Sequence, residues 1–327
     1  MFIDFSSAFN TIQPRILVEK LLQMKVNKYL CAWIFDFLTF RPQFVKLQAN
    51  STVFKSENLV LNVGAPQGTC ISPALFTIYT DDCRSESENI NIIKFADDTA
   101  IQCLMKENTT INDTETYKKQ IFNFASWCKN HFLQLNVSKT KEMIVDFRKS
   151  NFIHVKIFIE GQEVEVVENY KYLGVHINNR LDWHTHASTV ISKINQRMHF
   201  VRKLNFFKID KTLISLFYKS IIDSVISFCI CAWGGNTAER DINKINRIAR
   251  QATKITGIAQ CNFNDIFEKA CFLKITKILK DSSHPFHNKI TFSPRSDRII
   301  LIKTKKERFK NSFLPIAVKI YSLNQQR

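Results

Sequence analysis

The stretch Ile90–Met105, "INIIKFADDTAIQCLM", decides the fold. Apolar and polar residues alternate through "NIIKF" and again through "TAIQCL", which is the period of half-buried strands. The intervening "ADD" predicts a tight turn, so the two strands would form a hairpin with Asp97 and Asp98 at its tip. Two carboxylates held rigidly together repel each other, and a divalent cation would relieve that repulsion. The pair alone is weak support for a metal site, because hairpin turns often contain aspartate.

A second pair of adjacent aspartates, Asp81 and Asp82, lies in "PALFTIYTDDC" at the end of a predicted helix. The C-terminal end of a helix carries the negative pole of the helix dipole, so it is unfavourable for anions. We therefore expect this pair to be a solvated helix end with no chemical role.

Two other stretches support a metal site at the hairpin. "FIDFSSAFN" places Asp4 at the end of a short apolar strand, and "GAPQGTCISP" is a Gly/Pro loop with Gln67, whose backbone can approach a ligand closely. Two neighbouring strands that each end in aspartate would assemble a two-metal site for in-line phosphoryl displacement. Oxygen ligands favour Mg²⁺, although the residues alone leave a metal-dependent nuclease open as well.

The charge balance indicates a polyanionic partner. The chain has 327 residues, long enough for one or two domains, and Lys plus Arg outnumber Asp plus Glu by 46 to 29, a net charge of +17. Nucleic acid is the natural partner of such a chain, because each phosphate contact releases counterions. The alternatives are a basic surface without a partner and an anionic membrane surface, and no basic amphipathic anchor supports the membrane.

Cysteine usage and hydropathy favour an intracellular protein that does not span a membrane. The nine cysteines have no framework spacing, so we interpret them as reduced thiols. Residues Leu213–Trp233 are apolar over about 20 residues, the length of a membrane span. Lys219 and Asp223 lie in the middle of this segment, so we predict one buried helix instead.

The chain changes character near Asn179. Before it, strand and helix patterns follow one another in mixed order, which is typical of an α+β fold. After it, apolar residues recur at helical spacing, and one helix (239–257) carries a basic stripe that is either a solvated face or a phosphate-facing one. Residues 281–327 hold ten Lys or Arg against three Asp or Glu, which predicts a basic C-terminal tail.

Five stretches in this order carry a resemblance to a known family: "FIDFSSAFN", "GAPQGTCISPALFTIY", "KFADDTAI", "LQLNVSKTKEMIVDF" and "YKYLGV". Together they resemble the successive motifs of the reverse transcriptase of non-LTR (LINE-like) retrotransposons, over roughly the first 180 residues. The resemblance implies an α+β right-hand polymerase fold. Residues 1–179 would form the palm, an antiparallel sheet with helices, followed by a helical thumb-like region at 180–280 and the basic tail at 281–327.

The resemblance also implies roles for individual residues. Asp4, Asp97 and Asp98 match the catalytic carboxylates that bind two Mg²⁺ ions, or Mn²⁺, and Lys139 matches a lysine near the triphosphate that could protonate pyrophosphate. Ser72 could be a helix N-cap only. The remaining matches fall into two groups, the residues that contact the incoming nucleotide and those of the primer grip. The first group is Phe9, Pro66, Gln67 and Gly68, and the second is Tyr172, Leu173 and Gly174.

These matches predict an RNA-directed DNA polymerase that transfers a nucleotide from a dNTP to the 3′-hydroxyl of a DNA primer on an RNA template. Asp4 lies three residues after the start of the sequence, so we expect a fragment or truncated copy without fingers or endonuclease that polymerises poorly by itself. The alternative is a non-catalytic nucleic-acid-binding remnant of such an enzyme. A nuclease ranks last, because it does not explain the Gln67 loop. The family implies action in the nucleus.

Overall fold

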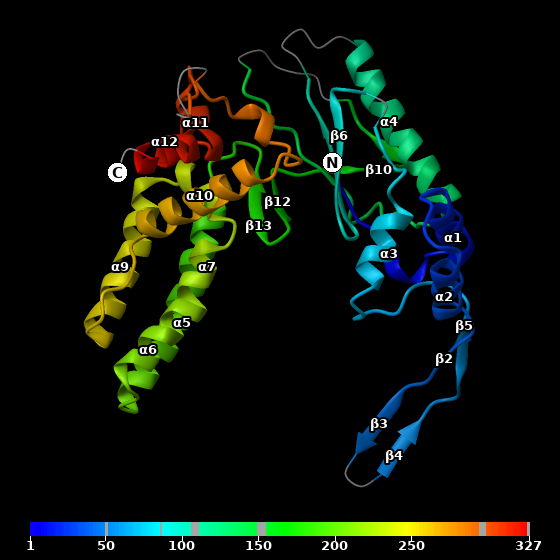
Figure 1. The fold of residues 1–327 in the computed structure, drawn as a ribbon, viewed down its shortest axis with the longest axis horizontal. Helices are drawn as coiled ribbons and strands as arrows, with labels where there is room; N and C mark the ends of the chain where they lie inside the picture. Colours follow the sequence, from blue (N-terminus) through cyan, green and yellow to red (C-terminus); the bar gives the residue numbers. More distant parts are fainter. Residues whose placement is uncertain (50–51, 86, 106–110, 149–154, 294–298, 326–327) are drawn as a thin grey trace. The chain divides into compact units, whose positions relative to one another are not determined.

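The computed structural model describes residues 1–327 except 50–51, 86, 106–110, 149–154, 294–298 and 326–327 (Figure 1). It divides into two compact units, Met1–Leu173 and Gly174–Arg327. The sequence predicted two boundaries, after residues 179 and 280. The structure has one division, between Leu173 and Gly174, in the turn that follows Tyr172. Each unit has its own hydrophobic core.

The first unit is built on a five-stranded sheet in the order β11-β8-β1-β7-β6. All neighbouring pairs are antiparallel except β11 and β8, which are parallel. The hairpin predicted from "ADD" is present as β6 and β7, in which Phe95 pairs with Asp98. The strands are β1 (Phe2–Ile3), β6 (Ile90–Phe95), β7 (Asp98–Cys103), β8 (Lys141–Glu142) and β11 (Glu165–Val166). Two further hairpins are β9 (Phe158–Ile159) with β10 (Gln162–Glu163), and β12 (Asn169–Tyr172) with β13 (Val175–Asn178).

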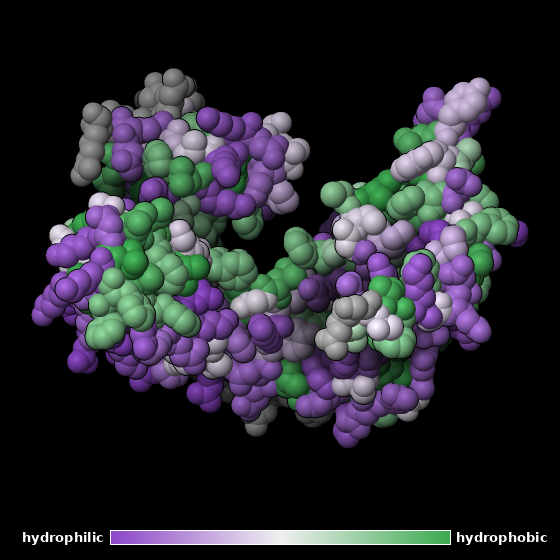
Figure 2. Space-filling view, turned by 90° about the horizontal axis from the view of Figure 1, so that it is seen from below, coloured by the Kyte–Doolittle hydropathy of each residue, from purple (hydrophilic) through white to green (hydrophobic). Residues whose placement is uncertain are grey.

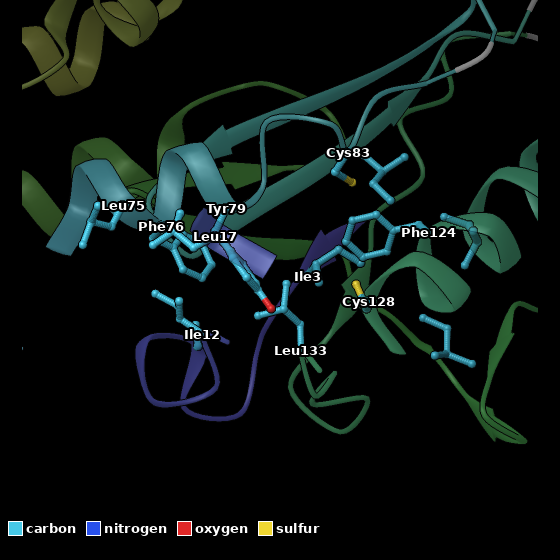
Figure 3. Packing of buried hydrophobic residues seen from close by; sticks show 14 of the residues in the cluster. Ile3, Ile12, Leu17, Leu75, Phe76, Tyr79, Cys83, Phe124, Cys128 and Leu133 are labelled. Atoms are coloured by element: carbon cyan, nitrogen blue, oxygen red, sulfur yellow. The ribbon is translucent and has the colours of Figure 1, made fainter. Parts of the chain in front are cut away.

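The helices α3 and α4 pack against the sheet, and α1 packs on α2 and α3. Figure 3 shows Ile3 of β1 close to Tyr79, Phe124 and Cys128, which come from α3 and α4. Burying one side chain of this size stabilises the folded state by about 1.5–3 kcal/mol. The burial of Ile3 therefore fixes the strand that leads into Asp4. The helices are α1 (Pro14–Gln23), α2 (Lys28–Leu38), α3 (Ser72–Tyr79) and α4 (Ile111–Asn130), with the short 3-10 helix η1 (Ala8–Asn10).

A two-stranded ribbon extends from the first unit between α2 and α3 (Figure 1). Its base is β2 (Arg41–Gln43) paired with β5 (Leu59–Leu61), and its outer part is β3 (Lys46–Ala49) paired with β4 (Thr52–Lys55). Val45 and Ser56 exchange hydrogen bonds between the two parts, at 2.9 Å each. The ribbon is therefore continuous, and every described residue of β3 and β4 is exposed.

The second unit is helical. Buried apolar residues at helical spacing, among them Ile194, Met198, Ile245 and Ala252, form one core. The α9 residues Arg247 and Lys254 of the predicted basic stripe are exposed. The helices are α5 (His184–Phe206), α6 (Lys211–Tyr218), α7 (Ser224–Ser227), α8 (Ile230–Trp233), α9 (Glu239–Thr256), α10 (Phe263–Lys280), α11 (Glu307–Lys310) and α12 (Phe313–Gln325). Three short turns complete it: η2 (Lys219–Asp223), η3 (Gly234–Asn236) and η4 (His287–Lys289).

The structure corrects the prediction of one helix over Leu213–Trp233. The segment is buried as expected, but α6 passes into the π-helical turn η2, and the chain bends by 44° between Lys211–Ser227 and Ile230–Asn236. Among the described residues no single helix is long and apolar enough to cross a membrane, although that bent pair meets the criterion by length and composition.

The predicted basic tail contains a structured end. Ala317 and Val318 of α12 are fully buried in the core of the second unit, and the ring of Tyr321 stacks on Phe272 of α10 at 5.9 Å. Within "KEMIVDF" the structure has one short strand, β8.

Candidate active site

Three carboxylates lie at one edge of the five-stranded sheet. Phe2 pairs with Ala100 and Ile3 with Thr99, so the same antiparallel register continued by one residue sets Asp4 opposite Asp98. Asp97 is the second residue of the two-residue turn between β6 and β7, in which Ala96 has a φ of 51°. The structure thus brings together residues that are more than ninety positions apart in sequence.

The charges of these carboxylates are not neutralised by protein cations. None of Asp4, Asp97 and Asp98 forms a salt bridge within the described part of the chain. Burial raises the pKa of Asp98, and the nearby charges of Asp97 and Asp4 raise it further. Within the described residues no group of three or more His, Cys, Asp or Glu side chains already has the geometry of a metal site. The carboxylates are therefore close enough to repel one another but are not drawn in around a common point.

The Gly64–Gly68 loop is tied to the turn that follows Asp4. Ala65 N donates to Phe9 O at 2.8 Å, and Gly64 N donates to Ile12 O at 2.7 Å. A Cβ on Gly64 would lie 2.8 Å from backbone atoms of Asn10, and its φ is 78°, so only glycine fits. Gln67 Nε2 reaches Asn10 Oδ1 at 3.4 Å. Phe9, Pro66, Gln67 and Gly68 are accordingly gathered in one place.

A cavity of about 490 Å³ lies beside this loop. Pro66 and Gln67 line it, together with Asn10, and Arg41 and Gln43 of β2 form its other side. Arg41 donates to the carbonyl oxygens of Val63 at 2.7 Å and Gly64 at 2.9 Å, so it fixes the chain where the loop begins. Phe9 is half-buried and its ring packs on Phe76 at 5.2 Å.

Ser72 has a different role from the helix cap that the sequence allowed. The N-cap of α3 is Ile71, and Ser72 is the first residue of the helix, almost fully buried. Its hydroxyl donates to Pro66 O at 2.6 Å and lies 2.6 Å from the hydroxyl of Thr69. Ser72 therefore holds the loop that carries Gln67 against α3.

Lys139 lies in an exposed turn that is anchored to the strand of Asp4. Asn136 N donates to Asp4 O at 2.9 Å, and Asp4 N donates to the hydroxyl of Thr140 at 3.3 Å. Lys139 N in turn donates to Asn136 O at 3.2 Å. This ties the turn of Lys139 to the backbone of Asp4, and the Lys139 side chain is exposed to solvent.

The β12–β13 hairpin brings tyrosines to the same edge. Tyr170 stacks on Phe2 with ring centroids 4.1 Å apart, and Tyr172 lies 5.3 Å from the same ring. Burial raises the pKa of both phenols, and the charge of Asp98 raises each further. Leu173 and Gly174 form the turn, with φ angles of 47° and 83°. Phe2 and Tyr170 escaped the sequence reasoning, although the period-2 pattern of "NYKY" already places Tyr170 and Tyr172 on one face.

The second aspartate pair follows the end of α3 and is half-exposed, as the sequence predicted, but each carboxylate also has a basic partner. Lys20 is buried in α1 and donates to Asp82 Oδ1 at 2.6 Å and to Tyr79 O at 2.5 Å. Burial alone would raise the pKa of Asp82, but the hydrogen bond and charge of Lys20, with the charge of His131, hold it below its usual value. Asp81 pairs with the exposed Arg84 at 3.0 Å. Both carboxylates are paired with basic side chains, and the absence of a chemical role for them stays a prediction.

Comparisons with known proteins agree with the motifs. A family model described as reverse transcriptase (RNA-dependent DNA polymerase) matches residues 1–177. A second, described as the N-terminal region of the alkylated DNA repair protein alkB homolog 8, matches residues 183–224. The chain therefore belongs to the reverse transcriptase family. Its relatives, described next, support the non-LTR (LINE-like) group that the five stretches indicated.

Among the similar curated proteins, a probable RNA-directed DNA polymerase from transposon BS of Drosophila melanogaster is 23% identical over 80% of this chain and 29% of its own length. The RNA-directed DNA polymerase from the mobile element jockey of Drosophila funebris is 23% identical over 90% of this chain and 32% of its own length. The chain thus spans about a third of the length of these relatives.

A solved structure of telomerase from Candida albicans, in complex with a fragment of telomeric RNA, aligns with 88% of this chain and 48% of its own. The identity is 11% and the TM-score 0.28, too low to carry an argument about the fold.

Proposed function

We propose that this chain carries the catalytic centre of an RNA-directed DNA polymerase of a non-LTR retrotransposon. The observation that carries the proposal is the convergence of Asp4, Asp97 and Asp98 at one sheet edge, where no cation of the described part of the chain forms an ion pair with them. In this assignment the first unit contains the palm, and the helices of the second unit serve as the thumb, which would follow a duplex through its backbone.

The three carboxylates fit a pair of divalent cations by their chemistry. They offer only hard oxygen donors, and the repulsion that raises the pKa of Asp98 disappears when a cation is shared. Mg²⁺ is the expected ion, with Mn²⁺ as a substitute. When bound, two such ions stabilise charge at the attacking and leaving oxygens of an in-line displacement.

The residues of the chain would bind and orient the reactants. The 3′-hydroxyl of the primer gives its proton to water and attacks the α-phosphate of the dNTP. The new phosphodiester bond forms as the bond between the α- and β-phosphates breaks and pyrophosphate leaves. Lys139, exposed beside the strand of Asp4, would give its proton to the pyrophosphate. Gln67 and Pro66 would contact the nucleotide from the cavity wall, and Phe9 would lie under its sugar.

The primer would be held by the β12–β13 hairpin. Its turn at Leu173 and Gly174 directly follows Tyr172, whose ring packs close to Phe2 on the strand of Asp4. The packing of Tyr172 on Phe2 would keep a primer terminus near the carboxylates.

Primer extension tests the proposal. The full chain would be incubated with a DNA primer on an RNA template, dNTPs and Mg²⁺, beside Asp97→Ala and Asp98→Ala variants. Because we expect the chain to polymerise poorly by itself, we expect weak extension that both substitutions abolish. Extension that survives both would refute the assignment of the site. RNA binding without extension by the unsubstituted chain would instead support the alternative, a non-catalytic nucleic-acid-binding remnant, for which the net charge of +17 is the favouring observation.

A further inference from the structure

The outer part of the ribbon exposes large apolar side chains on one face. Leu47 and Phe54, which pair across the strands, are 64% and 58% exposed. A two-stranded ribbon is only marginally stable in water, and the next pair, Lys46 and Lys55, lies on its opposite face. Figure 2, which looks toward the ribbon from its tip, shows hydrophobic and hydrophilic side chains lying side by side on this unit.

Two lysines of the ribbon oppose each other. Lys46 pairs directly with Lys55, so both ammonium groups project from the same face. Like charges placed opposite each other destabilise a strand pair. Neither lysine has a carboxylate partner within the described residues, and Glu57, just after β4, forms no ion pair with them. Lys55 Nζ also lies 5.4 Å from the ring of Phe44, which places that aromatic ring at the same face.

The ribbon leads into the candidate active site. Arg41, Gln43 and Leu61 belong to its base and also line the 490 Å³ cavity that holds Pro66 and Gln67. A strand that lay along the ribbon would therefore arrive at the loop expected to contact the incoming nucleotide. A phosphate between Lys46 and Lys55 would turn their repulsion into attraction, and the Phe44 ring could stack on a base.

We propose that the face formed by Phe44, Lys46 and Lys55 (the aromatic–basic face) binds the unpaired RNA template as it approaches the site. The choice of the template as occupant rests on the proposed polymerase function. The proposal that this face binds a single-stranded polynucleotide is independent of that function. It rests on the opposed lysines Lys46 and Lys55, on the nearby ring of Phe44, and on the exposure of all three side chains.

The first test is binding of a fluorescent single-stranded RNA of 12 nucleotides to the full chain, measured by anisotropy over a range of salt. We expect Lys46→Ala/Lys55→Ala to flatten the slope of log K against log salt by about 0.7 to 1.4, the contribution of one or two phosphates of a single strand. We expect Phe44→Ala to weaken binding at least about fivefold at every salt concentration.

The matched control is Lys119→Ala/Lys129→Ala on α4, which removes the same charge from exposed side chains of the same unit. If this control flattens the slope equally, binding is a property of net charge and the aromatic–basic face is not a site. Equal effects of the ribbon substitutions on a blunt RNA duplex, or no binding of single-stranded RNA by the unsubstituted chain, would also overturn the proposal.

Lys55→Glu separates binding from folding. It sets a carboxylate opposite Lys46, so the ribbon should become more stable and its amides should exchange hydrogen more slowly, while RNA affinity falls. Faster exchange together with the loss of affinity would show that Lys55 only supports the ribbon. The Asp97→Ala variant should bind the RNA normally without extending a primer. If it extends as well as the unsubstituted chain, the polymerase proposal fails while the binding result for the ribbon stands.

Discussion

The two pairs of adjacent aspartates show how one dipeptide serves two purposes. Asp81 and Asp82 follow α3, and each has a basic partner, Arg84 for the first and the buried Lys20 for the second. Asp97 and Asp98 lie at a hairpin turn beside Asp4, and burial together with their mutual repulsion raises the pKa of Asp98. The pKa of Asp82 is held low instead. The comparison teaches that the surroundings of a carboxylate pair, rather than its adjacency, decide whether it is available to bind a cation.

The largest difference between the pairs should appear in catalysis. Asp97→Asn should lower primer extension by at least about 10³-fold, because the remaining carboxylates cannot hold both cations, and should leave thermal stability unchanged or raised. Asp81→Asn is the control and should retain extension. Steady-state rates and melting temperatures of both variants check this. A loss of extension in Asp81→Asn equal to that in Asp97→Asn would remove the distinction.

The free energy of unfolding should respond in the opposite way: it should fall when Asp82 is replaced and not when Asp97 is replaced. Asp82→Asn leaves the charge of Lys20 buried without its carboxylate, so the free energy of unfolding should fall by about 1–2 kcal/mol, a figure reduced for the half-exposed position of Asp82. Asp81→Asn removes an exposed pair and should change it by less than about 0.5 kcal/mol. Urea unfolding at pH 7 measures both. Equal effects would mean that Lys20 finds another partner.

Cation binding gives a third contrast. Millimolar Mg²⁺ should raise the melting temperature of the unsubstituted chain, because a ligand that binds only the folded state stabilises it. The increase should vanish in Asp98→Asn and persist in Asp82→Asn. Differential scanning fluorimetry with and without EDTA would detect the shift. Persistence of the full shift in Asp98→Asn would place the cation elsewhere.

Asp223 in the second unit extends the comparison to a partly buried carboxylate that forms no ion pair within the described residues. Oδ1 of Asp223 is buried without a hydrogen-bond partner, and burial raises the pKa of this group to about 6, only slightly offset by the charge of Lys219. The folded state therefore keeps a proton that the unfolded chain loses near pH 4, so stability should fall as pH rises from about 4 to 6.

Asp223→Asn should remove this dependence. The expected gain in free energy of unfolding at pH 7.5 is about 1–2 kcal/mol, after allowance for partial exposure, with little change at pH 4. Unfolding curves at the two pH values check it. An equal gain at both would mean that the carboxylate is not protonated in the folded state, and that packing alone explains the change.

The sequence contains the parts of the site that depend on local pattern. Alternation on either side of "ADD" was enough to predict the β6–β7 hairpin, and the apolar run before Asp4 predicted its strand. Contacts between distant segments were not predictable in this way. Arg41 reaches carbonyl groups more than twenty residues away, and Lys20 meets Asp82 across 62 positions, which no periodicity records.

The second unit shows a limit of periodicity of another kind. The apolar spacing through Leu213–Trp233 is the same for a straight and a bent helix, so the π-helical turn and the 44° bend left no local signal. At the C-terminus the basic residues dominated the composition and concealed α12. Only a few residues of α12 are buried, so its sequence shows a weak apolar stripe. The contact with α10 that buries them is visible only in the folded structure.

The position of α12 has a consequence for synthesis of the protein. Ala317 and Val318 fill the same core as Ile194 and Met198, which leave the ribosome more than a hundred residues earlier. The helical unit therefore cannot complete its core until α12 has been made, whereas the sheet unit can fold once Leu173 has emerged. Until then the nascent helical unit leaves exposed the side of α10 that α12 covers, so this unit is the one that would depend on chaperones.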